Sequence, residues 1–357
     1  MASRAGRGTR GRGTGLRPDG RYLEWRREAS DDGWAPGEEP PPIVTSVRVE
    51  HPRSIISRND SPDIPFEASI NPYRGCEHGC VYCYARPTHA WLDLSPGVDF
   101  ESKLTAKPEA AALLSRELAA RGYRCTPIAM GTNTDPYQPV EKEWRITRDL
   151  IRVLHDCDHP LTIVTKSWRV ERDMDLLQDM ARKQLVQVYL SVTTLDHGLA
   201  RTMEPRAAAP ARRLRTISAL HEAGIPVGVM FAPVIPFLND SEMESVLGAA
   251  ADAGARWAGY VMLRLPLEIR DLFQSWLGEH VPLKAERVMN AIRDMRGGRE
   301  NDARFHTRQT GTGTLAGILR SRFDLACRRH GLNRKRLELR TDLFSPPRSG
   351  PAQISLF

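Results

Sequence analysis

The sequence predicts an α/β fold: a partial (β/α)6 barrel of the TIM type, with a disordered basic N-terminal arm and a small helical C-terminal extension. From about residue 65, apolar β-branched runs alternate with helical stretches, which is typical of βα units and a parallel sheet. About six such strands can be recognised, which fits a partial barrel better than a closed eight-stranded one. The length of 357 residues exceeds the roughly 100–200 of one ordinary domain, so one large barrel with extensions and two domains are both compatible with it.

The expected elements follow the apolar periodicity. The strands are Phe66–Asn71, Pro127–Thr132, Leu161–Thr165, Val186–Val192, Pro226–Phe231 and Trp257–Leu263. The helices are Glu109–Arg121, Glu143–Cys157, Met174–Lys183, Ala211–Ala223 and Glu242–Ala253. We expect Ser241 to be the N-cap of the last helix and Gly224 to end the one before it.

We divide the chain into a disordered basic arm (1–45), a (β/α)6 core (46–285), a basic helical extension (286–344) and a flexible tail (345–357). The arm is rich in Gly, Arg and Pro and has little apolar periodicity, as disordered segments do. In the extension, apolar residues recur at helical spacing, which predicts a basic amphipathic helix packed on the barrel. They are Leu315, Ile318, Leu319, Phe323 and Ala326.

Composition and charge restrict the class of protein. With 41% hydrophobic and 27% charged residues, and no run of ~18 apolar residues, a membrane protein is excluded. The N-terminus has no apolar signal region, so we expect a cytoplasmic protein whose six cysteines are ligands or free thiols. The net charge of +7 is concentrated at the two ends, in residues 1–28 and 320–340. Basic ends favour a polyanionic partner, although solvated extensions would have the same composition.

The most informative segment is 71–86, in which Cys76, Cys80 and Cys83 have CxxxCxxC spacing after a strand. Three thiolates on one loop can reach three corners of a 4Fe–4S cluster and leave one iron open to another ligand. Gly75 and Gly79 allow the backbone to wrap closely around such a cluster. The alternative is a zinc site with His78 as the fourth ligand, but its position between two cysteines suits tetrahedral closure poorly.

CxxxCxxC with the aromatic Tyr82 before the third cysteine, at the end of a first barrel strand, resembles the radical S-adenosylmethionine (SAM) superfamily. The resemblance implies that the open iron chelates SAM, and that an external electron donor reduces the cluster, which cleaves SAM to a 5′-deoxyadenosyl radical. It also implies a (β/α)6 barrel. The wider segments 71–86 and 131–139 are similar to the spore photoproduct lyase-related branch.

Active sites of βα barrels lie at the carboxyl ends of the strands, so the superfamily's SAM contacts are expected there. The resemblance implies contacts to the methionine amino group after the second strand, contacts to ribose and carboxylate after the fourth, and the aromatic of the cysteine loop. These residues are Thr132, Thr134 and Asp135, then Ser191 and Thr193, and Tyr82. An Asx or ST turn explains residues 131–135 nearly as well. Lys166 would neutralise a carboxylate or a phosphate, and Arg264 would face the barrel mouth in the expected register.

The relatives in this branch repair a thymine–thymine adduct in DNA, and a cysteine after their second strand returns a hydrogen atom. Gly131 takes that place here, so Tyr137, Tyr82 or Tyr84 is a candidate hydrogen relay, although buried tyrosines are more often core residues. The tail residues Gln353–Phe357 resemble the peptide by which bacterial repair proteins dock on the DNA sliding clamp.

We therefore expect a radical SAM enzyme, lyase-like and acting on nucleic acid, with DNA lesion repair as its function and no membrane association. One alternative is a radical SAM enzyme that modifies tRNA or protein. Another is a non-catalytic iron–sulfur protein that binds DNA or senses redox state.

Overall fold

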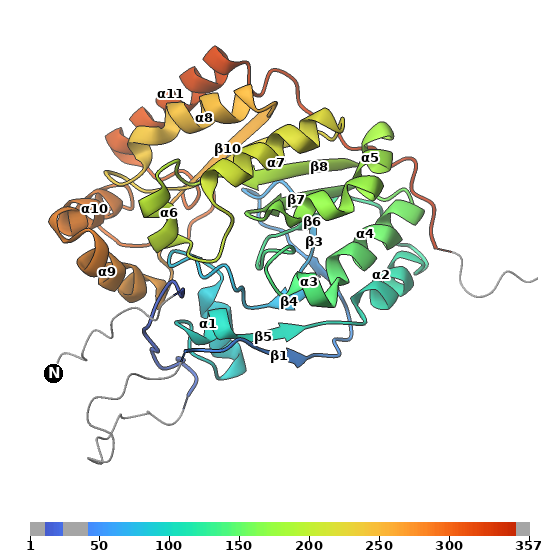
Figure 1. Ribbon diagram of the computed structural model, residues 1–357, viewed down its shortest axis with the longest axis horizontal. Coiled ribbons are helices and arrows are strands. Elements are labelled where there is room, and N and C mark those ends of the chain that lie inside the picture. The colour runs from blue at the N-terminus through green and yellow to red at the C-terminus, as the bar shows by residue number, and fades with distance from the viewer. Residues whose placement is uncertain (1–10, 24–41, 348–357) are drawn as a thin grey trace, which may run out of the picture.

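The computed structural model describes residues 11–23 and 42–347, and its centre is a curved parallel sheet surrounded by helices (Figure 1). The sheet contains the parallel strands β3 (Ala68–Ile70), β6 (Ile128–Met130), β7 (Leu161–Thr165), β8 (Val186–Ser191), β9 (Val227–Val234) and β10 (Trp257–Met262), in that order. β2 (Ile56–Arg58) is antiparallel to β3 at one edge. The prediction of a partial six-stranded barrel is confirmed.

The strands are close to those expected, and their ends have local causes. β7 has the expected bounds, whereas β6 is shorter and ends at Met130. The next residue, Gly131, has φ +89°, and a Cβ there would lie 1.9 Å from the carbonyl oxygen of Val164. Only glycine therefore fits at this point, where the chain leaves the sheet close to β7.

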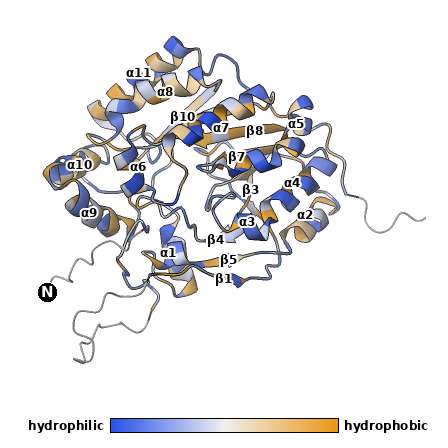
Figure 2. Cartoon of the chain, in the orientation of Figure 1, coloured by the Kyte–Doolittle hydropathy of each residue, from blue (hydrophilic) through white to orange (hydrophobic). Residues whose placement is uncertain are grey.

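Helices cover the outer face of the sheet and turn their apolar sides inward (Figures 1 and 2). They are α2 (Ala110–Leu118), α3 (Glu141–Trp144), α4 (Ile146–Asp156), α5 (Met174–Arg182), α6 (His197–Met203), α7 (Pro210–Glu222) and α8 (Met243–Asp252). Short 3-10 turns precede some of them: η2 (Trp168–Asp173) before α5 and η3 (Asp240–Glu242) before α8. The expected N-cap Ser241 is wrong, because it lies inside η3 and α8 begins after Glu242.

A second, three-stranded sheet was not expected from the sequence. It has the order β1 (Ser46–Val49), β5 (Lys103–Ala106) and β4 (Tyr73–Arg74), and it lies beside α1 (Asp99–Ser102). Its strands have two to four residues, too few to show a period. This sheet lies next to the cysteine loop, because its strand β4 leads directly into that loop.

The C-terminal part adds three helices, α9 (Ile269–His280), α10 (Pro282–Asp294) and α11 (Gly313–His330). The expected amphipathic helix is α11, which packs against α8, and the ring of its Phe323 lies 4.7 Å from the ring of Tyr260 of β10, centre to centre. Leu319, Phe323 and Ala326 belong to the main hydrophobic core, whereas Ile318 is 51% exposed. The expected apolar face is thus largely right, with Ile318 at its margin.

The N-terminal arm is not free of the barrel where it is described. Arg12 is buried and donates hydrogen bonds to the carbonyl oxygens of Glu101 and Ile43, at 2.7 and 2.8 Å. Residues 1–10 and 24–41 of the arm, and the tail residues Gln353–Phe357, lie outside the described residues. No helix among the described residues is long and apolar enough to span a bilayer.

Candidate functional site

The cysteine loop lies between β4 and the 3-10 helix η1 (Arg86–Leu92), at the carboxyl end of the first parallel strand, β3. Cys76 and Cys80 are buried and Cys83 is half-buried. Gly75 and Gly79 have φ +76° and +68°, the left-handed region that glycine enters without strain. A Cβ at Gly79 would lie 2.6 Å from the Glu101 carboxylate, so the loop is packed tightly on its outer side.

Arg86 determines the path of this loop. It has no exposed surface, and its guanidinium donates to the carbonyl oxygens of Cys80 (2.9 Å), Gly79 (3.1 Å) and Gly97 (2.8 Å). It also forms an ion pair with the buried Glu101, whose other oxygen accepts a hydrogen bond from the Gly13 amide at 2.8 Å. One buried cation thus holds the loop in a fixed shape.

The three thiols share one buried space. Burial raises the pKa of Cys80 to about 12 and also raises the pKa of Cys76 and Cys83. The charges of Cys80 and Cys83 raise the pKa of Cys76 further, as expected of neighbours. Metal ligands must be thiolates, so these cysteines would ionise when the positive charge of iron replaces their protons. Three soft donors with this burial fit an iron–sulfur cluster.

The imidazole of His78 contacts a carboxylate. Its Nδ1 lies 3.3 Å from the Asp135 carboxylate. Among the residues that the structure describes, no three His, Cys, Asp or Glu side chains converge on a point where one metal ion could sit. Zinc needs such convergence, whereas the corners of a cluster are bound by separate thiolates. The arrangement favours the cluster over the zinc alternative.

The segment after β6 lies against the cysteine loop. Asn71 Oδ1 accepts hydrogen bonds from the Asn133 and Thr134 amides, at 3.0 and 3.4 Å, and Asn71 Nδ2 lies 3.3 Å from Thr132 Oγ1. Gln138 joins the two segments, because its amide accepts from the Glu77 amide (2.9 Å) and donates to the Gly75 carbonyl (3.2 Å). This role of Gln138 was not predicted, because nothing in the sequence marks the residue as a contact to the cysteine loop.

Asp135 is held by several donors rather than left open. It accepts from the Thr165 hydroxyl and the Lys166 amide, both at 2.7 Å, and from the Tyr137 amide at 2.9 Å. Burial raises its pKa, but the charge of His78 and these hydrogen bonds outweigh burial and lower the pKa to about 2. Asp135 is therefore a carboxylate at neutral pH and carries a buried negative charge beside the cysteine loop.

The carboxyl end of β8 brings the next predicted residues together. Ser191 accepts a hydrogen bond from the Lys166 ammonium at 2.9 Å. Thr193 donates to Glu204 at 2.7 Å, and Tyr82 of the cysteine loop donates to the same carboxylate. The Lys166 ammonium lies 3.9 Å from Glu204 and 5.8 Å from the centre of the Tyr82 ring. Residues from three parts of the chain thus meet here, and their contacts to SAM stay a prediction.

Glu204 and Arg213 are the functional neighbours that the sequence did not reveal. Both are fully buried and form an ion pair, and Arg213 also donates to the Ser191 carbonyl at 2.9 Å. Burial raises the pKa of Glu204, but Arg213 and Lys166 lower it to about 2. Glu204 follows α6 and Arg213 lies in α7, so only the folded chain brings them together.

The tyrosines differ in their surroundings. Tyr84, next to Cys83, donates to the Thr132 carbonyl and links the cysteine loop to the segment after β6. The fully buried Tyr137 donates to Asp173 at 3.0 Å, a carboxylate that also pairs with Arg148. This contact gives Tyr137 a packing role, and its predicted hydrogen relay stays a prediction.

With this geometry in view, the chain can be compared with known proteins. The radical SAM superfamily profile matches residues 70–250. An uncharacterised protein of Mycobacterium tuberculosis is 35% identical over 291 residues, which cover 76% of this chain and 86% of the relative. An uncharacterised protein of Methanocaldococcus jannaschii is 30% identical over 174 residues, which cover 48% of this chain and 62% of the relative.

Solved structures show the same fold. A variant of spore photoproduct lyase is similar with a TM-score of 0.59, 15% identity and 80% coverage of both chains. Spore photoproduct lyase complexed with dinucleoside spore photoproduct is similar with a TM-score of 0.50, 16% identity and 66% coverage of both chains. The matched segment contains the cysteine loop and the carboxyl ends of β6, β7, β8 and β9. The chain therefore belongs to the radical SAM superfamily and is an enzyme of that class.

Proposed function

We propose that the enzyme binds a 4Fe–4S cluster through Cys76, Cys80 and Cys83, cleaves SAM and acts on nucleic acid, with damaged DNA as its substrate. The observation that carries the proposal is the set of three thiols on one rigid loop, two buried and one half-buried, with two fixed carboxylates close by. When bound and reduced, the cluster supplies the electron that converts SAM into a 5′-deoxyadenosyl radical.

The chain's own residues would hold SAM at the barrel mouth. Thr132 and Thr134 supply oxygen atoms for its amino group, which needs hydrogen-bond acceptors. Asp135, whose oxygens already accept from the protein, adds a negative charge beside that amino group. Lys166 supplies a cation for its carboxylate, and Ser191 keeps that ammonium in place at 2.9 Å. Thr193 and Tyr82 complete this side, where Glu204 orients both hydroxyl groups.

Two observations support nucleic acid as the substrate. Spore photoproduct lyase, which shares the fold, has been solved with a dinucleoside photoproduct. In this chain Trp168, the first residue of η2 after β7, is 43% exposed, and the guanidiniums of Arg169 and Arg212 lie 5.3 and 4.9 Å from its ring centre. An exposed aromatic ring close to two arginines suits a nucleobase that stacks and a phosphate beside it.

The cysteine assignment predicts loss of iron and of SAM cleavage together. Each of Cys76→Ala, Cys80→Ala and Cys83→Ala should abolish formation of 5′-deoxyadenosine under dithionite, since two thiolates cannot hold the cluster in its place. The measurement is product chromatography with iron analysis after anaerobic reconstitution. Cys125→Ala is the matched control, because Cys125 lies outside the loop and should keep both. A triple variant that retained its full iron content would refute the assignment.

Replacement of Glu204 should weaken both the fold and SAM binding. Glu204→Gln leaves the Arg213 guanidinium buried without a counterion, which typically lowers the free energy of unfolding by about 3–5 kcal/mol. Tyr82 and Lys166 also lose their shared carboxylate, so the dissociation constant for SAM should rise. Urea unfolding and equilibrium SAM binding measure the two effects. Glu286→Gln, on an exposed carboxylate of α10, is the control. Equal stability of the two variants would contradict this role.

The substrate assignment is tested by anaerobic turnover with mass analysis of the products. We expect a changed nucleotide mass in ultraviolet-irradiated DNA and none in unirradiated DNA or in tRNA. A modified nucleotide in tRNA alone would show that the enzyme modifies tRNA and does not repair DNA. SAM cleavage with no modified nucleic acid would point to a protein substrate.

We also propose that Gln353–Phe357 docks on the bacterial DNA sliding clamp. Leu356 and Phe357 would fill an apolar pocket, and the tether would raise the enzyme's concentration at replicating DNA. A chain that ends at residue 352 should lose clamp binding in surface plasmon resonance while its SAM cleavage stays intact. Unchanged affinity for the clamp in the shortened chain would rule out this docking segment.

A further inference from the structure

Arg264 is a cation at the barrel mouth that forms no ion pair with any residue the structure describes. It lies two residues beyond β10, at the carboxyl end of the last strand. Its guanidinium carbon is 5.7 Å from the centre of the Tyr84 ring, and Tyr84 directly follows the third cysteine. This places the positive charge beside the cysteine loop.

The guanidinium of Arg264 has no hydrogen bond or ion pair within the described ranges, and its Nε is buried without a partner. The Nε of the neighbouring Arg296 is also buried without a partner, but the terminal nitrogens of both neighbouring arginines, unlike those of Arg264, have acceptors. Arg308 forms two hydrogen bonds with Asp63, at 2.8 and 2.5 Å. Arg296 donates to the carbonyl oxygens of Leu263, Thr307 and Arg308. A buried polar group without a partner is destabilising, so its retention points to a ligand that completes it.

The local electrostatic field favours an anion at this place. Burial lowers the pKa of Arg264, and the positive charge of Arg308 lowers it further. Arg296 is also a close neighbour, because the charge of Arg264 adds to burial in lowering the pKa of Arg296 to about 10. Three guanidiniums thus lie close together, and Asp63 is bonded to only one of them. A bound oxyanion would offset this repulsion and satisfy the free nitrogens of Arg264.

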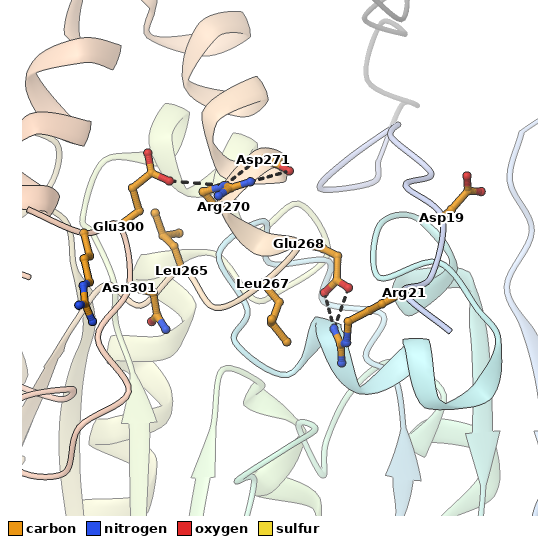
Figure 3. Close-up of a pocket in the computed structure, with 10 residues that line it drawn as sticks. Asp19, Arg21, Leu265, Leu267, Glu268, Arg270, Asp271, Glu300 and Asn301 are labelled. Carbon is orange, nitrogen blue, oxygen red and sulfur yellow. Dashed lines mark hydrogen bonds and ion pairs between the residues drawn. The ribbon is translucent and has the colours of Figure 1, made fainter. Parts of the chain in front are cut away.

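An open pocket of about 580 Å³ lies beside the end of β10, with Leu265, the residue after Arg264, in its wall, although Arg264 itself does not line it (Figure 3). Figure 3 shows that Arg21 and Arg270 on its wall are already paired, with Glu268 and with Asp271 and Glu300. The wall holds more carboxylates than guanidiniums, so we place the bound anion at the Arg264 guanidinium and not in this pocket.

The oxyanion is better matched by a phosphate than by the carboxylate of SAM. Lys166, after β7, already offers a cation on the other side of the mouth, with β8 and β9 between it and β10. Arginine presents two parallel N–H groups that match two phosphate oxygens, and phosphates recur along a nucleic-acid strand.

We propose that Arg264 binds a backbone phosphate of the nucleic-acid substrate and positions the adjacent nucleotide over the cysteine loop. This inference rests on the proposed function, since it names how that substrate is held. Arg264 carries no sequence information itself, because a phosphate contact fixes register and orientation rather than base identity.

The test is fluorescence anisotropy of a short labelled oligonucleotide on the reconstituted full chain. Arg264→Gln should weaken binding roughly ten- to hundredfold, as loss of a charged hydrogen bond does. The slope of log affinity against log salt should fall in magnitude by about 0.7–0.9, which corresponds to one phosphate contact. Arg264→Lys should have the wild-type slope but only part of the wild-type affinity, because lysine keeps the charge and lacks the two parallel N–H donors of arginine.

Two matched controls separate a contact from a general charge effect. Arg182→Gln removes one positive charge at the end of α5, which leads into the start of β8, far from the barrel mouth, and should leave both the affinity and the slope close to wild type. An oligonucleotide with a neutral methylphosphonate at each position in turn should reproduce the Arg264→Gln loss at one position. In the Arg264→Gln variant, the methylphosphonate at that position should cause no further loss of affinity.

The outcomes distinguish this inference from the proposed function. If the wild type binds and Arg264→Gln binds equally well with the same salt slope, the inference is wrong and the proposed function stands. A variant that loses SAM affinity while it keeps oligonucleotide affinity would assign Arg264 to the SAM carboxylate and overturn the phosphate contact. Wild-type protein that binds no oligonucleotide would overturn both.

Discussion

The buried ion pair between Arg86 and Glu101 is the interaction on which the site depends. Thiolate ligands must stand at fixed places before the cluster arrives, and a loop with two glycines has no such rigidity of its own. The guanidinium provides it by binding the carbonyl oxygens of Gly79 and Cys80. The desolvation of this guanidinium is compensated because each of its described hydrogen-bond acceptors is a carbonyl or carboxylate oxygen.

A second buried pair, Arg213 with Glu204, fixes the opposite wall by the same principle. It joins the end of β8 to Tyr82, so the cysteine loop is held from both sides. Within the described residues, the buried carboxylates Glu101 and Glu204 each have a buried arginine as ion-pair partner. Arg264 departs from this pattern, which is why we assign its partner to the substrate.

The parallel strands and the cysteine loop could be predicted because their signals are local: buried β-branched runs and a fixed spacing. The sheet of β1, β5 and β4 could not, because strands of two to four residues have no readable period. Glu204 and Arg213 resemble ordinary helix-end residues until the fold turns both inward. Arg12 lies in an Arg- and Gly-rich segment whose composition is typical of disorder. In the folded chain, however, its guanidinium donates to the carbonyl oxygens of Glu101 and Ile43.

The N-terminal segment is part of the wall around the cysteine loop. A Cβ at Gly13 would lie 1.6 Å from the Gly79 carbonyl oxygen, so the two glycines are in backbone contact. Trimming the chain to the barrel alone, a usual step towards crystals, would remove this contact and open the loop to solvent and oxygen. An affinity handle is therefore safer on an internal surface loop than at a shortened N-terminus.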